Sequence, residues 1–174
     1  MIHLIDALLT DRLQQIGNLK HVGYYTGQDA QGQDGKLAFS TPAAFLEYLP
    51  VDWNTMHRNV QEAELTFRVR ILTLNYQNRR EAYAPLPSAL AQMVYLRLHG
   101  YSARLSDTAD YASIPDIQDH TLIGSIQRVR SQPDHSQSNM QRYVETYRCA
   151  IYDATKRINR VAVSPNFEAD TNAV

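Results

Sequence analysis

The chain has 174 residues, of which 44% are apolar and 20% are charged, so it can form one domain with a substantial core. Its formal charge of −1 and isoelectric point near 6.6 argue against a protein that holds nucleic acid by the phosphate backbone, because such proteins carry basic patches. The single cysteine, Cys149, excludes an intrachain disulfide and a multi-cysteine metal site, and it fits a reducing compartment.

The first predicted element is an amphipathic helix over residues 2–16, where apolar residues recur at helical spacing and Gly17 follows. This N-terminal segment lacks the basic region of a signal peptide. No apolar run approaches the roughly 18 residues that would span a bilayer. We therefore expect a soluble protein that is made in the cytoplasm and has no membrane contact.

Two short elements are expected next. Residues 21–26 predict a strand, and residues 28–36 predict a turn-rich loop because they contain two glycines and two aspartates. Residues 43–50 predict a second strand, since Pro42 and Pro50 stand at its ends and proline cannot donate to a sheet ladder.

After a connection at residues 51–59, the strongest pattern of the chain begins. Apolar and polar residues alternate without a break from Glu62 to Ile71, and a period of two predicts a strand with one buried face. The residues expected to be buried are Ala63, Leu65, Phe67, Val69 and Ile71. The charged residues of the opposite face are Glu62, Glu64, Arg68 and Arg70. We interpret these four residues as a candidate inter-subunit or lumen surface, the alternative being a solvated face.

The remaining elements follow a long polar segment. Residues 89–99 predict a second helix, and residues 101–119 are expected to be irregular. Residues 122–130 and 143–153 predict two further strands, with a polar hairpin tip at residues 131–140 between them.

This order of elements predicts an α+β domain over residues 1–153. Its sheet is expected to be mainly antiparallel, with four to five strands, two helices packed on one face and a polar face opposite. Extended loops and an extended C-terminal arm over residues 154–174 complete the prediction.

Motifs that would indicate an enzyme are missing from the sequence, which has no P-loop, dinucleotide fingerprint, zincin motif or nucleophile elbow. Asp116, Asp119 and His120 offer oxygen and nitrogen ligands for a divalent metal, although a polar loop explains them more simply. Asp29 and Asp34 suggest a calcium loop only weakly, because glutamines occupy intervening ligand positions, and a turn is the better interpretation.

Single reactive side chains give no clearer site. Cys149 alternates inside a predicted strand, where cysteine is more often a small core residue than a nucleophile. Arg79 and Arg80 would suit a phosphate beside a loop, but two adjacent arginines are ordinarily a solvated turn.

Aromatic residues and the last turn of the second predicted helix do not indicate a site either. Tyr143, Tyr147 and Tyr152 would stack on bases in a single-strand binder, but without a basic groove they are better explained by packing or an interface. His99 stands at a predicted helix C-terminus, where positive charge is favourable. Because no cluster of titratable residues converges, we predict a protein without catalysis, metal or cofactor.

The order of the segments resembles a known family. An N-terminal helix precedes Thr41–Pro50, which leads into Glu62–Ile71, and a helix at Ser88–His99 and a last strand at Tyr143–Asp153 follow. Over Met1–Asp153 this pattern is similar to the tail-terminator (tail-completion) proteins of long-tailed bacteriophages and prophages. In that family a proline and a small, apolar strand precede a long strand with acidic, aromatic and apolar positions. The loop at 101–119 and the arm beyond residue 154 depart from the compact family pattern.

The resemblance implies a structural virion protein that assembles as a ring, usually a hexamer. Such a ring caps the tail tube, stops its polymerisation and docks to the head connector or head-completion protein. DNA would pass through the lumen without specific binding, and the protein, made in the host cytoplasm, would end at the tail–head interface of the virion. The alternatives are another head–tail connector, adaptor or head-completion protein and, more remotely, a small metal-dependent hydrolase using Asp116, Asp119 and His120.

Overall fold

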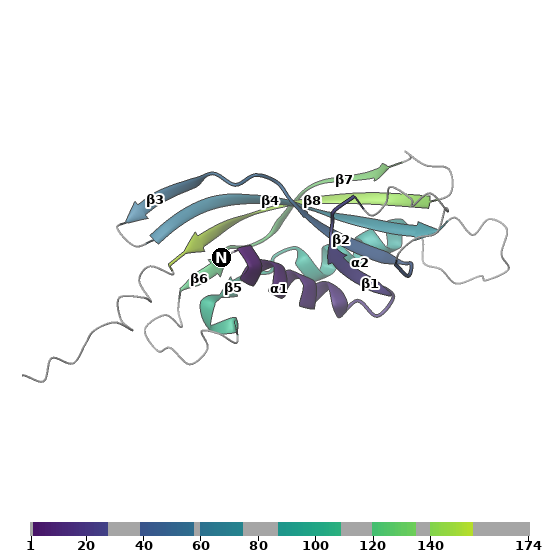
Figure 1. The fold of residues 1–174 in the computed structure, drawn as a ribbon, viewed down its shortest axis with the longest axis horizontal. Helices are drawn as coiled ribbons and strands as arrows, with labels where there is room; N and C mark the ends of the chain where they lie inside the picture. The colour runs from purple at the N-terminus through teal and green to yellow at the C-terminus, as the bar shows by residue number, and fades with distance from the viewer. Residues whose placement is uncertain are drawn as a thin grey trace, which may run out of the picture.

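Two long antiparallel strands form the centre of the molecule in a computed structural model (Figure 1). They are β4 (Val60–Leu74) and β8 (Met140–Asp153), which pair continuously from Gln61 opposite Asp153 to Leu74 opposite Met140. The structure describes residues 2–27, 39–57, 60–74, 87–108, 120–134 and 140–154.

Shorter strands extend this pair on both sides. The remaining elements are α1 (Ile2–Gln14), β1 (His21–Tyr24), β2 (Ala43–Tyr48), β3 (Trp53–His57), α2 (Pro87–Leu98), β5 (Ala103–Arg104), a 3-10 turn (Leu105–Asp107), β6 (Thr121–Ile123) and β7 (Gln127–Asp134). The strand order is β1-β2-β4-β8-β6-β5, with β3 also paired to β4 and β7 also paired to β8. The described part of the chain therefore forms one curled sheet of eight strands.

The two helices cover the same face of the sheet (Figure 1). In α1 the buried residues recur at helical spacing, and in α2 they do the same; they are Leu4, Ile5, Leu9 and Leu13, then Leu90, Ala91, Val94 and Leu98. Pro87 begins α2, where its missing N–H costs nothing, and Gly100 follows the helix with a φ of +78° that favours glycine.

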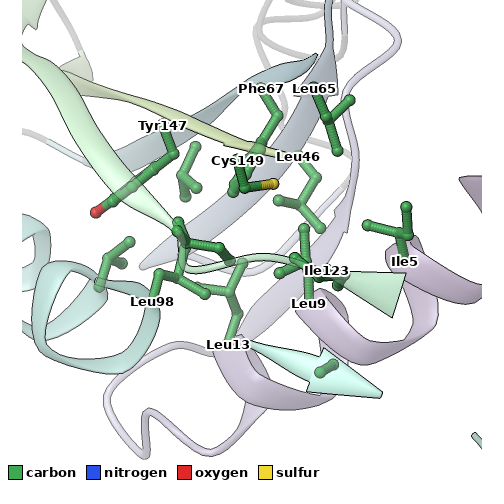
Figure 2. Close-up of a cluster of buried hydrophobic side chains, with 14 of the residues drawn as sticks. Ile5, Leu9, Leu13, Leu46, Leu65, Phe67, Leu98, Ile123, Tyr147 and Cys149 are labelled. Atoms are coloured by element: carbon green, nitrogen blue, oxygen red, sulfur yellow. The ribbon is translucent and has the colours of Figure 1, made fainter. Parts of the chain in front are cut away.

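The main core lies between these helices and the sheet (Figure 2). Phe67 of β4 and Tyr147 of β8 are fully buried opposite one another, and their rings stack with centroids 5.5 Å apart. The Tyr48 hydroxyl of β2 donates to the Asp6 carboxylate at 3.0 Å, which ties α1 to the sheet. The expectation of two helices on one face of a β-sheet is thus met.

The predicted sheet is wrong in its size and pairing. It has eight strands rather than four to five, and it is mixed because β1 pairs with β2 in parallel from His21 opposite Ala43 to Tyr24 opposite Leu46. β3 lies in the expected connection at residues 51–59, and β5 lies in the segment expected to be irregular. Short strands such as these have too few residues to show an alternating pattern, so their pairing is decided by the neighbouring strand.

The predicted strand at residues 122–130 is two strands. β6 ends at Ile123, and β7 begins at Gln127 and continues through the first residues of the expected hairpin tip to Asp134. Between them the Ile126 N–H donates to the Tyr101 carbonyl, and the Gly100 N–H donates to the Ile126 carbonyl. These bonds to the end of α2 interrupt the ladder, which a pattern of local residues does not predict.

Several expectations lie outside the described residues. They are the loop at 28–36, the Arg79–Arg80 pair, most of the segment 101–119 and nearly all of the arm at 154–174. Among the helices that the structure describes, none combines the length and apolar character needed to cross a membrane.

Candidate functional site

The alternation along β4 separates a core face from an outer face, as the sequence predicts. Leu65, Phe67, Val69 and Ile71 are fully buried on the core face, and Ala63 is 3% exposed. On the outer face Glu64 is exposed, whereas Glu62, Arg68 and Arg70 are half-buried. The four charged residues singled out from the sequence therefore share one face but differ in their surroundings.

The basic end of this face is held by a carboxylate of the next strand. Glu47 of β2 lies opposite Arg68 in the ladder, and it accepts a hydrogen bond from Arg70 Nε at 2.8 Å. Arg68 Nη1 is 3.6 Å from the same carboxylate oxygen. The Arg70 guanidinium also lies over the ring of Tyr25, 4.3 Å from its centroid, and its side chain is only 20% exposed. Arg70 is thus part of the fold, while Arg68, at 38% exposed, remains accessible.

Beyond Arg70 the outer face becomes apolar. Ala43, Phe45 and Leu72 are buried there, and Tyr25 and Phe39 pack against them. The Phe39 and Phe45 rings meet edge to face with centroids 4.8 Å apart. The outer face is consequently not polar throughout, because its β1–β2 end is covered by aromatic side chains.

The acidic end of the outer face contains a shallow hollow. Its volume is about 240 Å³, and the residues that line it are Asn54, Glu62, Ala63, Glu64 and Ala150. Glu64 lies 3.6 Å from Arg148 Nε across the β4–β8 pair, and the two side chains are 64% and 49% exposed. Such an exposed pair contributes little to stability, so both charges remain accessible to a partner.

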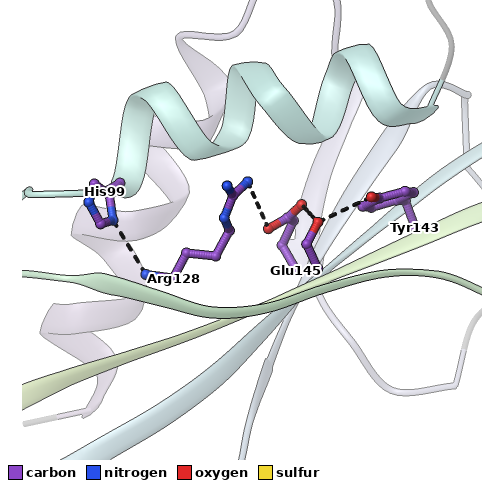
Figure 3. Close-up of polar contacts among 5 residues, drawn as sticks. His99, Arg128, Tyr143 and Glu145 are labelled. Atoms are coloured by element: carbon purple, nitrogen blue, oxygen red, sulfur yellow. Dashed lines mark hydrogen bonds and ion pairs between the residues drawn. The ribbon is translucent and has the colours of Figure 1, made fainter.

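A second polar cluster lies on the core face, between α2 and the β7–β8 pair (Figure 3). Glu145 of β8 is fully buried there. Its carboxylate accepts a hydrogen bond from Ser131 Oγ at 2.5 Å and lies 3.7 Å from Arg128 Nη1. Ser131 Oγ also shares a hydrogen bond with the Tyr143 hydroxyl at 3.2 Å. Burial raises the pKa of Glu145, and the contacts with Ser131 and Arg128 partly oppose that shift.

The same cluster fixes the beginning of β7 against α2. The Arg128 guanidinium lies over the Tyr95 ring, 4.0 Å from its centroid, and Tyr95 in turn stacks on His99. The backbone N–H of Arg128 donates to His99 Nδ1 at 3.4 Å (Figure 3). The Tyr147 hydroxyl is buried with no hydrogen-bond partner among the described residues, and burial raises its pKa, with a further contribution from Glu145. This arrangement anchors a strand around a fully buried carboxylate.

Two further candidates from the sequence, His99 and Tyr143, belong to the Glu145 cluster, whereas Cys149 lies in the main core. Cys149 is 4% exposed, and burial raises the pKa of its thiol to about 12, so it carries almost no thiolate at neutral pH. Tyr147 is fully buried and cannot stack on bases. The carbonyl of His120 accepts the Leu105 N–H. The proposed metal ligands Asp116 and Asp119 lie outside the described residues. The same holds for the other candidates from loops, which are Asp29, Asp34, Arg79 and Arg80.

Across the segments that the structure describes, no three histidine, cysteine, aspartate or glutamate side chains come together as a metal site. The Glu145 cluster was not predicted from the sequence. A signal for it existed, because Glu145 shares its strand face with Tyr143, Tyr147, Cys149 and Ile151, and a carboxylate on an apolar face requires partners.

No protein-family model matches the sequence, and the search of curated proteins gives no significant match.

Proposed function

We propose that this chain is a ring-forming structural subunit of the tail-terminator type. In this role it caps a phage tail tube, stops the polymerisation of the tube and joins the tail to the head connector. The proposal comes from the resemblance in the order of segments along the sequence. The structural observation that supports it best is the outer face of β4 and β8, on which the described residues place no helix.

The charges on that face suit a contact between different patches of identical subunits. A ring closes when one surface of a subunit meets a different surface of the next, so each copy must offer two patches. One end of the outer face is acidic at Glu62 and Glu64, whereas the half-buried Arg68 and the exposed Arg130 of β7 lie elsewhere on it. Complementary charges of this kind select partner and register more than they add affinity.

The first test is the assembly state of the purified protein. We expect class averages from electron microscopy to show rings, and mass photometry to give a single mass several times that of the 19.8 kDa chain. A protein that remains monomeric at micromolar concentration contradicts the proposal.

The second test separates a terminator from another head–tail connector component. Particles assembled without the protein should carry overlong tails or tails without heads if it terminates the tube. DNA-filled heads that leak would instead indicate a connector or head-completion protein.

Reversal of charge at Arg68 tests whether the outer face is an inter-subunit surface. We expect Arg68→Glu to abolish ring formation at low salt while the circular dichroism spectrum stays unchanged, because the Arg68 side chain is 38% exposed and only loosely paired with Glu47 at 3.6 Å. Arg70→Glu is not a suitable variant, because Arg70 holds Glu47 and Tyr25 within the subunit. Rings that form normally with Glu at position 68 would show that this part of the face is solvated or lines the lumen.

A further inference from the structure

Two edge strands lie on opposite sides of the central β4–β8 pair. β3 pairs with the first residues of β4 on the side away from β8, and β7 pairs with β8 on the side away from β4. Figure 1 shows them at opposite ends of the sheet. Within the described residues, neither strand has a second neighbour in the sheet, so each leaves backbone N–H and C=O groups facing outward, of which the Arg128 N–H already donates to His99.

Each edge carries a β-bulge, and in each case the extra residue is an exposed apolar side chain. On β3, Thr55 lies opposite Gln61 and His57 opposite Val60, which leaves Met56 as the inserted residue. On β7, Arg128 lies opposite Tyr147 and Arg130 opposite Thr146, which leaves Val129 inserted. Met56 is 49% exposed and Val129 is 56% exposed. A bulge redirects a side chain away from the regular ladder, and here both bulges direct an apolar side chain into solvent.

The two edges also differ in charge. Arg130 follows Val129 and lies on the outer face of β7, since it is opposite Thr146, which is opposite Arg68. Beside β3, the outer face carries the hollow lined by Glu62 and Glu64, and Asn54 of β3 lies opposite Glu62. Neighbouring strands are about 4.8 Å apart, so an arginine on a strand added beyond β3 would reach across Asn54 to these carboxylates.

The β7 edge is held in position before any partner arrives. Arg128 contacts the buried Glu145 and lies over Tyr95, while Ser131 donates to the same carboxylate. These contacts fix the residues on both sides of Val129 and Arg130. An edge that is rigid in advance loses less conformational entropy when it binds.

We propose that the β7 edge of one copy docks against the β3 edge of the next copy, with Val129 beside Met56 and Arg130 over the Glu62–Glu64 hollow. The contact joins two different edges, so its repetition continues the sheet from subunit to subunit, and it gives a closed ring when the rotation between neighbours closes on itself. Bulges and arginines protect an edge from pairing with unrelated strands, and here they favour pairing with the β3 edge, which carries an exposed apolar residue beside an acidic hollow. The proposal rests on the proposed function only in requiring that copies assemble.

Cross-linking of single-cysteine variants tests the contact. Met56→Cys and Val129→Cys are prepared separately, mixed, allowed to exchange subunits, and treated with a short bis-maleimide. We expect covalent dimers in the mixture at several-fold the level found with either variant alone, because a head-to-tail contact joins position 56 only to position 129. The native Cys149 is buried, and the unaltered protein gives the background.

Leu96→Cys provides the matched control. Leu96 lies on α2 and is 69% exposed, so a cysteine there is at least as accessible as one at position 56, but it is not on a sheet edge. Mixed with Val129→Cys, it should give only background dimers. Rings that form without the 56–129 cross-link overturn the edge contact and leave the proposed ring intact. A chain that stays monomeric overturns both, and dimers of Val129→Cys with itself overturn the head-to-tail arrangement.

Charge reversal gives an independent measurement that needs no cysteine. We expect Arg130→Glu to raise the protein concentration at which half of the chains are assembled by about tenfold, and added Glu64→Lys to restore part of that loss. Arg97→Glu, the same change on an exposed position of α2, should leave assembly unchanged. Equal effects of the changes at positions 130 and 97 would contradict the contact.

Discussion

Glu47 and Glu145 lie on the two strands that flank β4, at nearly the same level but on opposite faces of the sheet. Glu47 is opposite Arg68 on the outer face, is 22% exposed and is approached by two arginines. Glu145 is opposite Val69 on the core face, is fully buried and is approached by one arginine and one serine. Glu47 holds two arginines at the surface, and Glu145 anchors an edge strand to a helix.

This difference shows that a charged residue on a strand has no fixed role. The Glu47 cluster is partly exposed, so its longer pair with Arg68 contributes little and Arg68 remains available to a partner. Glu145 has lost its water, and each of its contacts replaces part of the lost hydration. Substitutions in the Glu145 cluster should therefore lower the free energy of unfolding more than substitutions in the Glu47 cluster.

The largest effect is expected at Glu145. Glu145→Ala removes the hydrogen bond from Ser131 and leaves Arg128 without its buried partner, so we expect the free energy of unfolding to fall by about 3 kcal/mol in urea titrations. Asp11→Ala, which removes an exposed carboxylate of α1 outside the proposed contacts, is the control and should cost about 0.5 kcal/mol or less. Equal losses would mean that burial of Glu145 carries no energetic consequence.

The next effect distinguishes the two arginines beside Glu47. Arg70→Ala should lower the free energy of unfolding by about 1.5 kcal/mol, because it removes a 2.8 Å hydrogen bond and the contact with the Tyr25 ring. Arg68→Ala should cost about 0.5 kcal/mol, because its pair with Glu47 is longer and more exposed. Thermal unfolding of both variants in parallel measures the two losses of stability. A larger loss for Arg68→Ala than for Arg70→Ala would contradict the view that Arg70 is the arginine held within the fold.

A smaller effect should appear in the pH dependence of stability. Burial raises the pKa of Glu145 in the folded state above the value of 4.5 expected for the unfolded chain. Between the unfolded and the folded pKa, the folded chain holds a proton that the unfolded chain has released. Its contribution to stability is therefore greatest below pH 4.5 and falls as the pH rises through the folded pKa. Glu145→Gln removes this titration, so the stability of the natural protein relative to this variant should decline from pH 4 to pH 7. A constant difference across that range would exclude a raised pKa.

The smallest effect concerns only the reaction of cysteine thiols with a labelling reagent. Cys149 lies on the core face with a thiol pKa of about 12, whereas its neighbour Arg148 points to the outer face and is 49% exposed. The native protein should react with a thiol reagent only after unfolding in urea. Arg148→Cys should give one fast-reacting thiol per chain in the native state, and rapid labelling of the unaltered protein would contradict the burial of Cys149.

Much of the central architecture is predictable from local patterns. The period of two from Glu62 to Ile71 predicts the core face of β4 residue by residue, and helical spacing predicts α1 and α2. These elements are long enough for one face to repeat several times. The prediction of four to five mainly antiparallel strands fails because β3, β5 and β6 have only two to five residues each.

The candidate surface on β4 is likewise predictable only in part. The sequence by itself determines that Glu62, Glu64, Arg68 and Arg70 share a face, because alternate residues of any strand do so. Only the tertiary structure decides that Arg70 is held by Glu47 and Tyr25, that Glu62 and Glu64 line a hollow beside Asn54, and that Glu145 meets Arg128 under α2. The physical reason is that these partners lie on other strands and helices, and the register between strands is set by packing across the whole sheet.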